Sequence, residues 1–194
     1  MKRRIIIGIS GASGAIYGIR ALMHLREIDA VESHLILTDS AATTISLETD
    51  YSLEQVRALA DVVHRNENIA ASIASGSYIG TAMAILPCSI RTLSAVALSR
   101  ADNLIARAAD VVLKEQRKLV LAVRETPLHK GHLELMVKAA DIGATILPPM
   151  PAFYHDPQTI DDIVDHTVGK VFDMLDIEHR LFRRWGDPKS RTPV

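Results

Sequence analysis

Continuous apolar runs alternate along the chain with stretches in which apolar residues recur every three or four positions. The continuous runs are typical of strands buried on both faces of a parallel sheet, and they cover about residues 4–9, 33–38, 81–86, 118–123 and 144–147. The periodic stretches predict helices over about residues 15–27, 41–47, 53–63, 90–98, 103–114, 132–142 and 159–176. We therefore expect one α/β domain over residues 1–194: a three-layer sandwich around a mostly parallel sheet, with an extended tail from about residue 180.

The turn after the first apolar run carries the strongest local signal. Gly8, Gly11 and Gly14 recur at three-residue spacing between a predicted strand and a predicted helix. Glycine allows a backbone to approach a phosphate closely, and a helix N-terminus attracts anions. Ser10 and Ser13 add hydroxyl donors, and either one can cap the helix. The spacing is neither a P-loop nor a dinucleotide fingerprint, so the turn favours a phosphate or flavin phosphate over a ligand-free connection.

Composition excludes several classes of protein. A net charge of −1 and 4% aromatic residues argue against a nucleic-acid partner. The single cysteine, Cys88, excludes an internal disulfide and favours a reducing compartment. The first apolar run is too short for a secretory signal, and no run approaches the ~20 residues of a membrane span. We expect a soluble cytoplasmic protein with no membrane contact.

Hydroxyl groups and cations follow the predicted strands. Ligands of parallel sheets bind beyond the carboxyl ends of the strands, so these residues are candidates for a site that holds one or two phosphates. The hydroxyl donors are Ser13, Thr38, Ser89 and Thr92, and the cations are Arg107, Lys114, Arg117, Lys118 and Arg124. The alternative is a solvated helix face on which the cations pair with nearby carboxylates.

Four further features have two interpretations each. Glu48 is either a general base or a carboxylate at a helix end, and the residues alone favour the latter. Cys88 fits a small buried apolar residue better than a nucleophile, because no histidine partner is evident. His129 and His132 lack the further ligands that a metal site requires, so we expect no metal. Trp185, between arginine and glycine, either stacks on a ligand or fixes the tail to the surface.

Short motifs along nearly the whole chain carry a resemblance to one known family. They are Gly11–Ala15, Ser75–Ser77, Pro87–Ser89, Arg107–Val111, Leu113–Glu115, Arg124–Pro127, Pro148–Tyr154 and Arg184–Gly186. In their order and spacing the chain closely resembles the UbiX-like flavin prenyltransferases, formerly labelled aromatic or phenolic acid decarboxylases. The resemblance implies a Rossmann- or flavodoxin-like sheet and a homododecamer.

The resemblance also implies an activity. Family members transfer a dimethylallyl group from dimethylallyl phosphate to N5 of reduced FMN, then close a ring onto the flavin's benzene ring, without a metal. The product, prenylated FMN, serves a separate UbiD-type decarboxylase. The positions that match FMN-binding residues of the family are Gly11, Ala12, Ser13, Thr38, Ser89, Ile90, Arg91, Thr92 and Arg124.

The resemblance further assigns the prenyl donor site and the catalytic residues. The positions that match the donor site are Arg107, Lys114, Tyr154, Lys170 and Trp185, with Tyr154 and Lys170 reaching over from neighbouring subunits. Ser13, which also contacts the donor phosphate, and Glu48, which handles a proton near N5, match catalytic positions. Two positions depart from the family pattern: Thr38 replaces a serine, and Lys170 replaces an arginine and so offers a point charge instead of a fork.

Two other functions are considered beside the prenyltransferase. An FMN-dependent cysteine decarboxylase of the same fold would carry a catalytic histidine, which the segment Ile73–Ser77 lacks. A non-catalytic FMN carrier would need the glycine turn but not the cations Arg107, Lys114 and Arg124. Formation of a prenyl adduct on FMN distinguishes the three.

Overall fold

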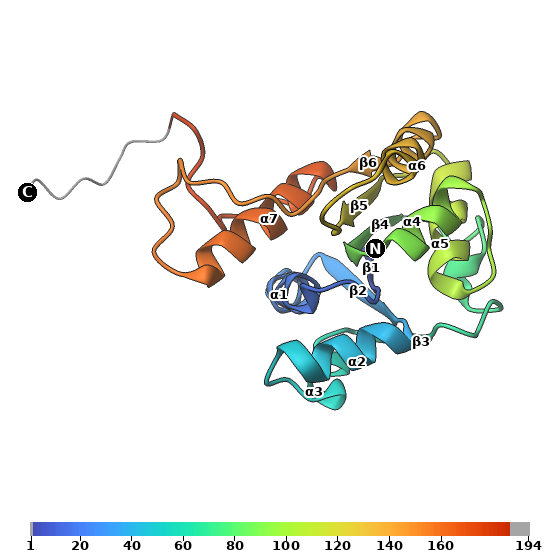
Figure 1. The fold of residues 1–194 in the computed structure, drawn as a ribbon. Helices are drawn as coiled ribbons and strands as arrows, with labels where there is room; N and C mark the ends of the chain where they lie inside the picture. The colour runs from blue at the N-terminus through green and yellow to red at the C-terminus, as the bar shows by residue number, and fades with distance from the viewer. Residues whose placement is uncertain (1, 187–194) are drawn as a thin grey trace, which may run out of the picture.

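The computed structural model describes residues 2–186, and in these a parallel sheet lies between two layers of helices (Figure 1). Its strands are β1 (Arg3–Ile9), β2 (Val31–Leu37), β3 (Val62–Arg65), β4 (Thr81–Cys88), β5 (Leu119–Val123) and β6 (Thr145–Ile146). The strand order is β3-β2-β1-β4-β5-β6, and every neighbouring pair is parallel. This confirms the predicted α/β class.

Alternate residues of the strands pack against different helices, and this produces the three layers. On one face, Ile5 and Ile7 of β1 join a core with α1 (Ala15–Arg26), α2 (Asp39–Glu48), α3 (Leu53–Arg57) and α7 (Ile160–Met174). On the other face, Ile6 joins a core with α4 (Ile90–Ala97), α5 (Leu104–Lys114), α6 (Lys130–Asp141) and the 3₁₀ turn η1 (Ser72–Ala74). Figure 1 shows α1 and α7 together on one side of the sheet and α4, α5 and α6 on the other. No helix of residues 2–186 is long and apolar enough to cross a membrane.

One predicted element is wrong. The helix expected over residues 53–63 ends at Arg57, and residues 62–65 form β3 instead. The predicted start of this helix is correct, because Ser52 and Gln55 form a reciprocal capping box. The predicted end is wrong, because Val62 pairs with His34 along the open edge of β2. The β-branched residues of this segment suit that edge, and tertiary pairing overrides the helical pattern.

The end of the chain is only partly described. Residues 180–186 form bends and turns without a helix or strand, and the rest of the predicted tail, residues 187–194, lies outside the described residues.

Candidate active site

A cavity of about 370 Å³ opens at the carboxyl ends of β1, β2 and β4. The chain continues from β1 toward β2 on one side and from β4 toward β5 on the other, so this is the point where the strand order reverses. Five residues predicted for the site line the cavity: Gly11, Thr38, Ser89, Arg91 and Thr92. The topology thus assembles most of the hydroxyl donors that the sequence placed after separate strands.

Three helices begin at the cavity wall, each with a polar N-cap. Thr38 caps α2 by accepting from the Ala41 N–H at 3.1 Å. Ser89 caps α4, accepting from the Thr92 N–H at 3.3 Å. Asn103 caps α5 by accepting from the Ala106 N–H at 3.0 Å. Because the positive ends of three helix dipoles and several hydroxyls converge here, the cavity suits an anion such as a phosphate monoester.

Buried contacts hold the two principal turns together. Ser10 is fully buried, and its hydroxyl donates to the Pro87 carbonyl at 2.9 Å while it accepts from the Ser89 N–H at 2.7 Å. Ser10 is therefore structural and does not cap α1. Gly11 lies against α2 so closely that a Cβ at this position would approach the Cβ of Ser40 to 2.2 Å. Only glycine fits the turn at this point.

The N-terminus of α1 is occupied by the chain's own carboxylate. Its N-cap is Gly14, with φ of 99° and no side-chain cap, so the expectation that Ser10 or Ser13 caps this helix is wrong. Instead, the Oε2 atom of Glu48 accepts from the Gly14 N–H at 2.7 Å. The contact brings Glu48 beside Ser13, although the two are far apart in the sequence.

Arg124 lies at the end of β5, next to the cavity turns. Its backbone N–H donates to the Cys88 carbonyl at 3.0 Å. Burial raises the pKa of Tyr17 on the first turn of α1, and the positive charge of Arg124 opposes this, which places the guanidinium near that ring. Cys88 is fully buried, and burial raises the pKa of its thiol, so it packs as a small apolar residue.

Several cavity residues were missed by the sequence interpretation. Asn66 follows β3, and it accepts from two N–H groups at the start of α5: the Leu104 N–H through its carbonyl at 2.7 Å and the Ile105 N–H through Oδ1 at 3.1 Å. Because β3 was read as a helix, nothing placed Asn66 at a strand end. The other lining residues are Asp39, Ser40, Ala95, Arg100, Asp102, Asn103, Ile105 and Ala106.

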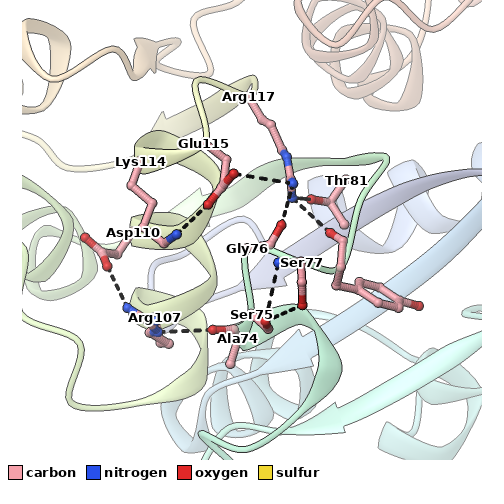
Figure 2. Close-up of polar contacts among 11 residues, drawn as sticks. Ala74, Ser75, Gly76, Ser77, Thr81, Arg107, Asp110, Lys114, Glu115 and Arg117 are labelled. Atoms are coloured by element: carbon pink, nitrogen blue, oxygen red, sulfur yellow. Dashed lines mark hydrogen bonds and ion pairs between the residues drawn. The ribbon is translucent and has the colours of Figure 1, made fainter.

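The cations of α5 form a second group around the Ser75–Ser77 loop (Figure 2). Arg107 donates to the Ala74 carbonyl at 3.2 Å and pairs with Asp110 at 2.9 Å. At the end of α5, Lys114 pairs with Glu115, while Arg117 donates to the carbonyls of Gly76 and Tyr78 and to the Thr81 hydroxyl. Arg107 and Lys114 both keep part of their side chains exposed.

A third group lies on α7 and the segments that follow it and precede it. The Tyr154 hydroxyl lies 2.9 Å from Nε2 of His166, and its ring meets Trp185 edge-on with centroids 5.8 Å apart. Lys170, one turn beyond His166, pairs with Asp173 at 3.3 Å. Trp185 is 85% exposed, so most of its ring is free for a further contact.

The three groups do not all meet within one chain. Arg117 contacts Thr81, the first residue of β4, whereas Ser89 follows the last. The eight-residue strand β4 spans about 25 Å. The segment that follows α5 therefore lies at the amino ends of the strands, whereas the cavity lies at their carboxyl ends. Lys118 also lies at the amino ends, where it pairs with Asp176. The expectation that all five cations gather with the strand-end hydroxyls is therefore wrong within a single chain for Lys114, Arg117 and Lys118, whereas Arg124 does lie next to the cavity turns.

His129 and His132 lie at the start of α6 with ring centroids 3.5 Å apart. His129 accepts from the Gly131 N–H and so acts as the N-cap. Within residues 2–186 no three His, Cys, Asp or Glu side chains are grouped as metal ligands would be.

Comparison with known proteins places the chain among flavoproteins. The Flavoprotein family model matches residues 1–177. The flavin prenyltransferase UbiX of Salmonella typhimurium is 60% identical over 185 residues, covering 94% of this chain and 98% of that protein. UbiX of Escherichia coli K12 is 58% identical over the same shares of the two chains, and UbiX of Thauera aromatica is 56% identical over 188 residues (97% and 96%).

Solved structures of UbiX proteins have the same fold as this chain. AnUbiX (PadA1), crystallised with FMN and dimethylallyl pyrophosphate, superposes with a TM-score of 0.94 at 44% identity, covering 97% of this chain and all of that one. A dodecameric FMN-dependent UbiX-like decarboxylase from Escherichia coli O157:H7 superposes with a TM-score of 0.91 at 49% identity (94% and 98%). The peptidyl-cysteine decarboxylase EpiD shares only the fold, with a TM-score of 0.63 at 14% identity.

Proposed function

Since the chain belongs to the UbiX-like flavin prenyltransferase family, we propose that it transfers a dimethylallyl unit from dimethylallyl phosphate to reduced FMN. The observation that carries the proposal is the cavity at the strand-order reversal, where the N-caps of three helices converge on one space. The product is prenylated FMN, which serves as cofactor for a UbiD-type decarboxylase. The reaction takes place in the cytoplasm, where the one free thiol, Cys88, stays reduced.

The lining residues fit FMN. Thr38, Ser89 and Thr92 offer hydroxyls beside the N-termini of α2 and α4, which suits the flavin's phosphate monoester, and Arg91 adds a positive charge. Asp39 and Asn103 offer acceptors for a polyol chain. Ala12 and Arg124 lie in the turns that surround these groups, and Ile90 is the first residue of α4.

Each group of side chains has a task in the transfer. When bound, reduced FMN supplies the nucleophilic N5 atom and the ring carbon onto which the prenyl unit closes. As the allylic C–O bond breaks, its electron pair goes to the phosphate oxygen, and Ser13, Arg107 and Lys114 stabilise the departing dianion. Glu48 holds or accepts a proton near N5. The Trp185 ring lines the prenyl pocket, where an aromatic face tolerates the developing positive charge and keeps water away.

The complete site requires several subunits. Lys114 lies at the far end of α5, about 16 Å from the cavity wall where that helix begins. Lys170 on α7 and Trp185 beyond it form a separate, partly exposed group. We assign these residues to the cavities of neighbouring copies in a homododecamer, an arrangement supported by the dodecameric relative. Lys114 reaches one neighbour, and Tyr154 with Lys170 reaches another. Side chains from several subunits around the cavity then bind the donor phosphate.

The test is direct. The protein is mixed anaerobically with reduced FMN and dimethylallyl phosphate, and the flavin is extracted for mass spectrometry. We expect FMN to gain one five-carbon prenyl unit, only when protein is present. FMN that binds but gains no mass would leave a carrier, and release of CO₂ from a peptide with a C-terminal cysteine would instead indicate a decarboxylase.

A further inference from the structure

His166 lies beside Tyr154 and Lys170, two of the residues that the proposed function assigns to the prenyl phosphate. It is 6% exposed on the inner face of α7. Its Nε2 atom is 2.9 Å from the Tyr154 hydroxyl, and Lys170 lies one helical turn further along the same face. Neither the family motifs nor the strand-end pattern drew attention to this histidine.

The direction of the hydrogen bond decides what Tyr154 can do. A phenol has one proton, and a phosphate monoester dianion offers only acceptors. If the Tyr154 hydroxyl donates to His166, no proton is left for the phosphate. If His166 carries its proton on Nε2 and donates it to the phenol oxygen, the phenol proton is free to point at the phosphate.

The surroundings keep His166 in one place and uncharged. His155 stacks on its ring with centroids 4.5 Å apart and planes 10° from parallel, and Phe182 packs at 4.6 Å. Burial lowers the pKa of His166, the charges of His155 and Lys170 lower it further, and Asp173 opposes them. At neutral pH the ring is therefore a neutral imidazole whose single proton occupies one nitrogen or the other.

We propose that His166 is a positioning residue for the prenyl donor: its Nε2–H donates to the Tyr154 oxygen and so directs the Tyr154 hydroxyl proton toward the donor phosphate. The inference rests on the proposed function, because it assumes that Tyr154 touches that phosphate. His166 acts only through Tyr154 and makes no contact with substrate. The role explains why a polar ring is buried among aromatic side chains beside a phenol.

The test measures binding without turnover. Protein loaded with oxidised FMN, which cannot accept the prenyl unit, is titrated calorimetrically with dimethylallyl phosphate. We expect Tyr154→Phe to weaken binding about tenfold, since a hydrogen bond to a charged group is lost. His166→Phe keeps the phenol proton but loses the donor that orients it, so it should weaken binding by a smaller factor of about five, and the double variant should be no weaker than Tyr154→Phe. His166→Gln, whose amide N–H can replace Nε2–H, should bind within about twofold of the unchanged chain.

Each outcome decides a different point. If Tyr154→Phe binds normally, the assignment of Tyr154 to the phosphate fails, and the role of His166 fails with it. If Tyr154→Phe weakens binding but His166→Phe does not, only the role of His166 is overturned. Additive losses in the double variant would also overturn it. His155→Phe keeps a ring stacked on His166 and removes no bond to Tyr154, so it should bind within about twofold of the unchanged chain. A tenfold loss there would show that any change in this aromatic cluster weakens binding, and the specific role of His166 would be overturned.

Discussion

The carboxylate of Glu48, the last residue of α2, accepts a 2.7 Å hydrogen bond from the backbone N–H of Gly14, where α1 begins. A helix N-terminus that follows a glycine turn commonly binds an anion from a ligand. Here the chain's own carboxylate already occupies it. In the proposed function the flavin phosphate binds instead at the N-termini of α2, α4 and α5, and Glu48 lies next to the proposed catalytic Ser13.

Glu48→Gln tests whether this side chain acts through its hydrogen bond to the start of α1 or through its ability to take up a proton. The amide oxygen can still accept from the Gly14 N–H, but the side chain no longer takes up a proton. We expect prenylation in single turnovers to slow by about 100-fold or more, with FMN affinity changed less than about twofold. Glu54→Gln, an exposed change on α3, is the matched control and should leave both unchanged. Normal turnover in Glu48→Gln would reduce Glu48 to a helix cap.

Ser89→Ala tests the α4 cap as a phosphate ligand. The variant loses the bond to the Thr92 N–H and a hydroxyl that faces the cavity, so stability should fall by about 1 kcal/mol and FMN affinity about tenfold. Ser52→Ala removes the equivalent cap of α3, away from the cavity. It should lose similar stability but bind FMN normally. Equal FMN affinities in the two variants would contradict the site.

Gly11→Ala tests the closeness of the first turn to α2. The added Cβ would lie 2.2 Å from the Cβ of Ser40, so the turn or the helix must move. We expect a loss of about 1–3 kcal/mol in stability and little FMN binding, measured by thermal unfolding and flavin fluorescence. Because Ser40→Gly removes the contacted atom, the double variant should recover part of both. No recovery would place the constraint elsewhere.

Mixed assemblies test whether Lys114 acts on a neighbour. Ser13→Ala and Lys114→Met chains should each be inactive alone. Refolded or co-expressed together, they should regain activity, because some cavities then combine an intact Ser13 with an intact Lys114 from another chain. Ser13→Ala mixed with Glu48→Gln is the control: both residues serve the same chain's cavity, and no activity should return. Failure of the first mixture would rule out the shared site.

Acid should remove one specific contribution to stability. Burial alone would raise the pKa of Asp173, but hydrogen bonds from Arg184, His179 and Lys170 outweigh it and lower the pKa to about 2. A lowered carboxyl pKa stabilises the fold fully above about pH 4, and the contribution disappears as the pH falls through about 2. Asp173→Asn should therefore lower the thermal midpoint at pH 7, with a difference that shrinks below pH 4. A constant difference would show that the charge is not responsible.

The sequence by itself determined the order of most strands and helices, the glycine turn and the N-cap at Ser52. These follow from local patterns: apolar runs, helical periodicity and capping residues such as Ser52 act over a few neighbours. The family motifs also point to Ser13, Ser89 and Lys114 as site residues.

Only the tertiary structure decided which of these residues meet. Residues 62–65 became a strand because β2 offered an open edge, and that strand delivers Asn66 to the cavity. Glu48 reaches Gly14 because α2 returns along α1. Lys114 lies away from the cavity because α5 begins at the cavity wall and runs about 16 Å toward the other end of the strands. Local pattern contains no information on such distances, since they depend on how whole elements pack.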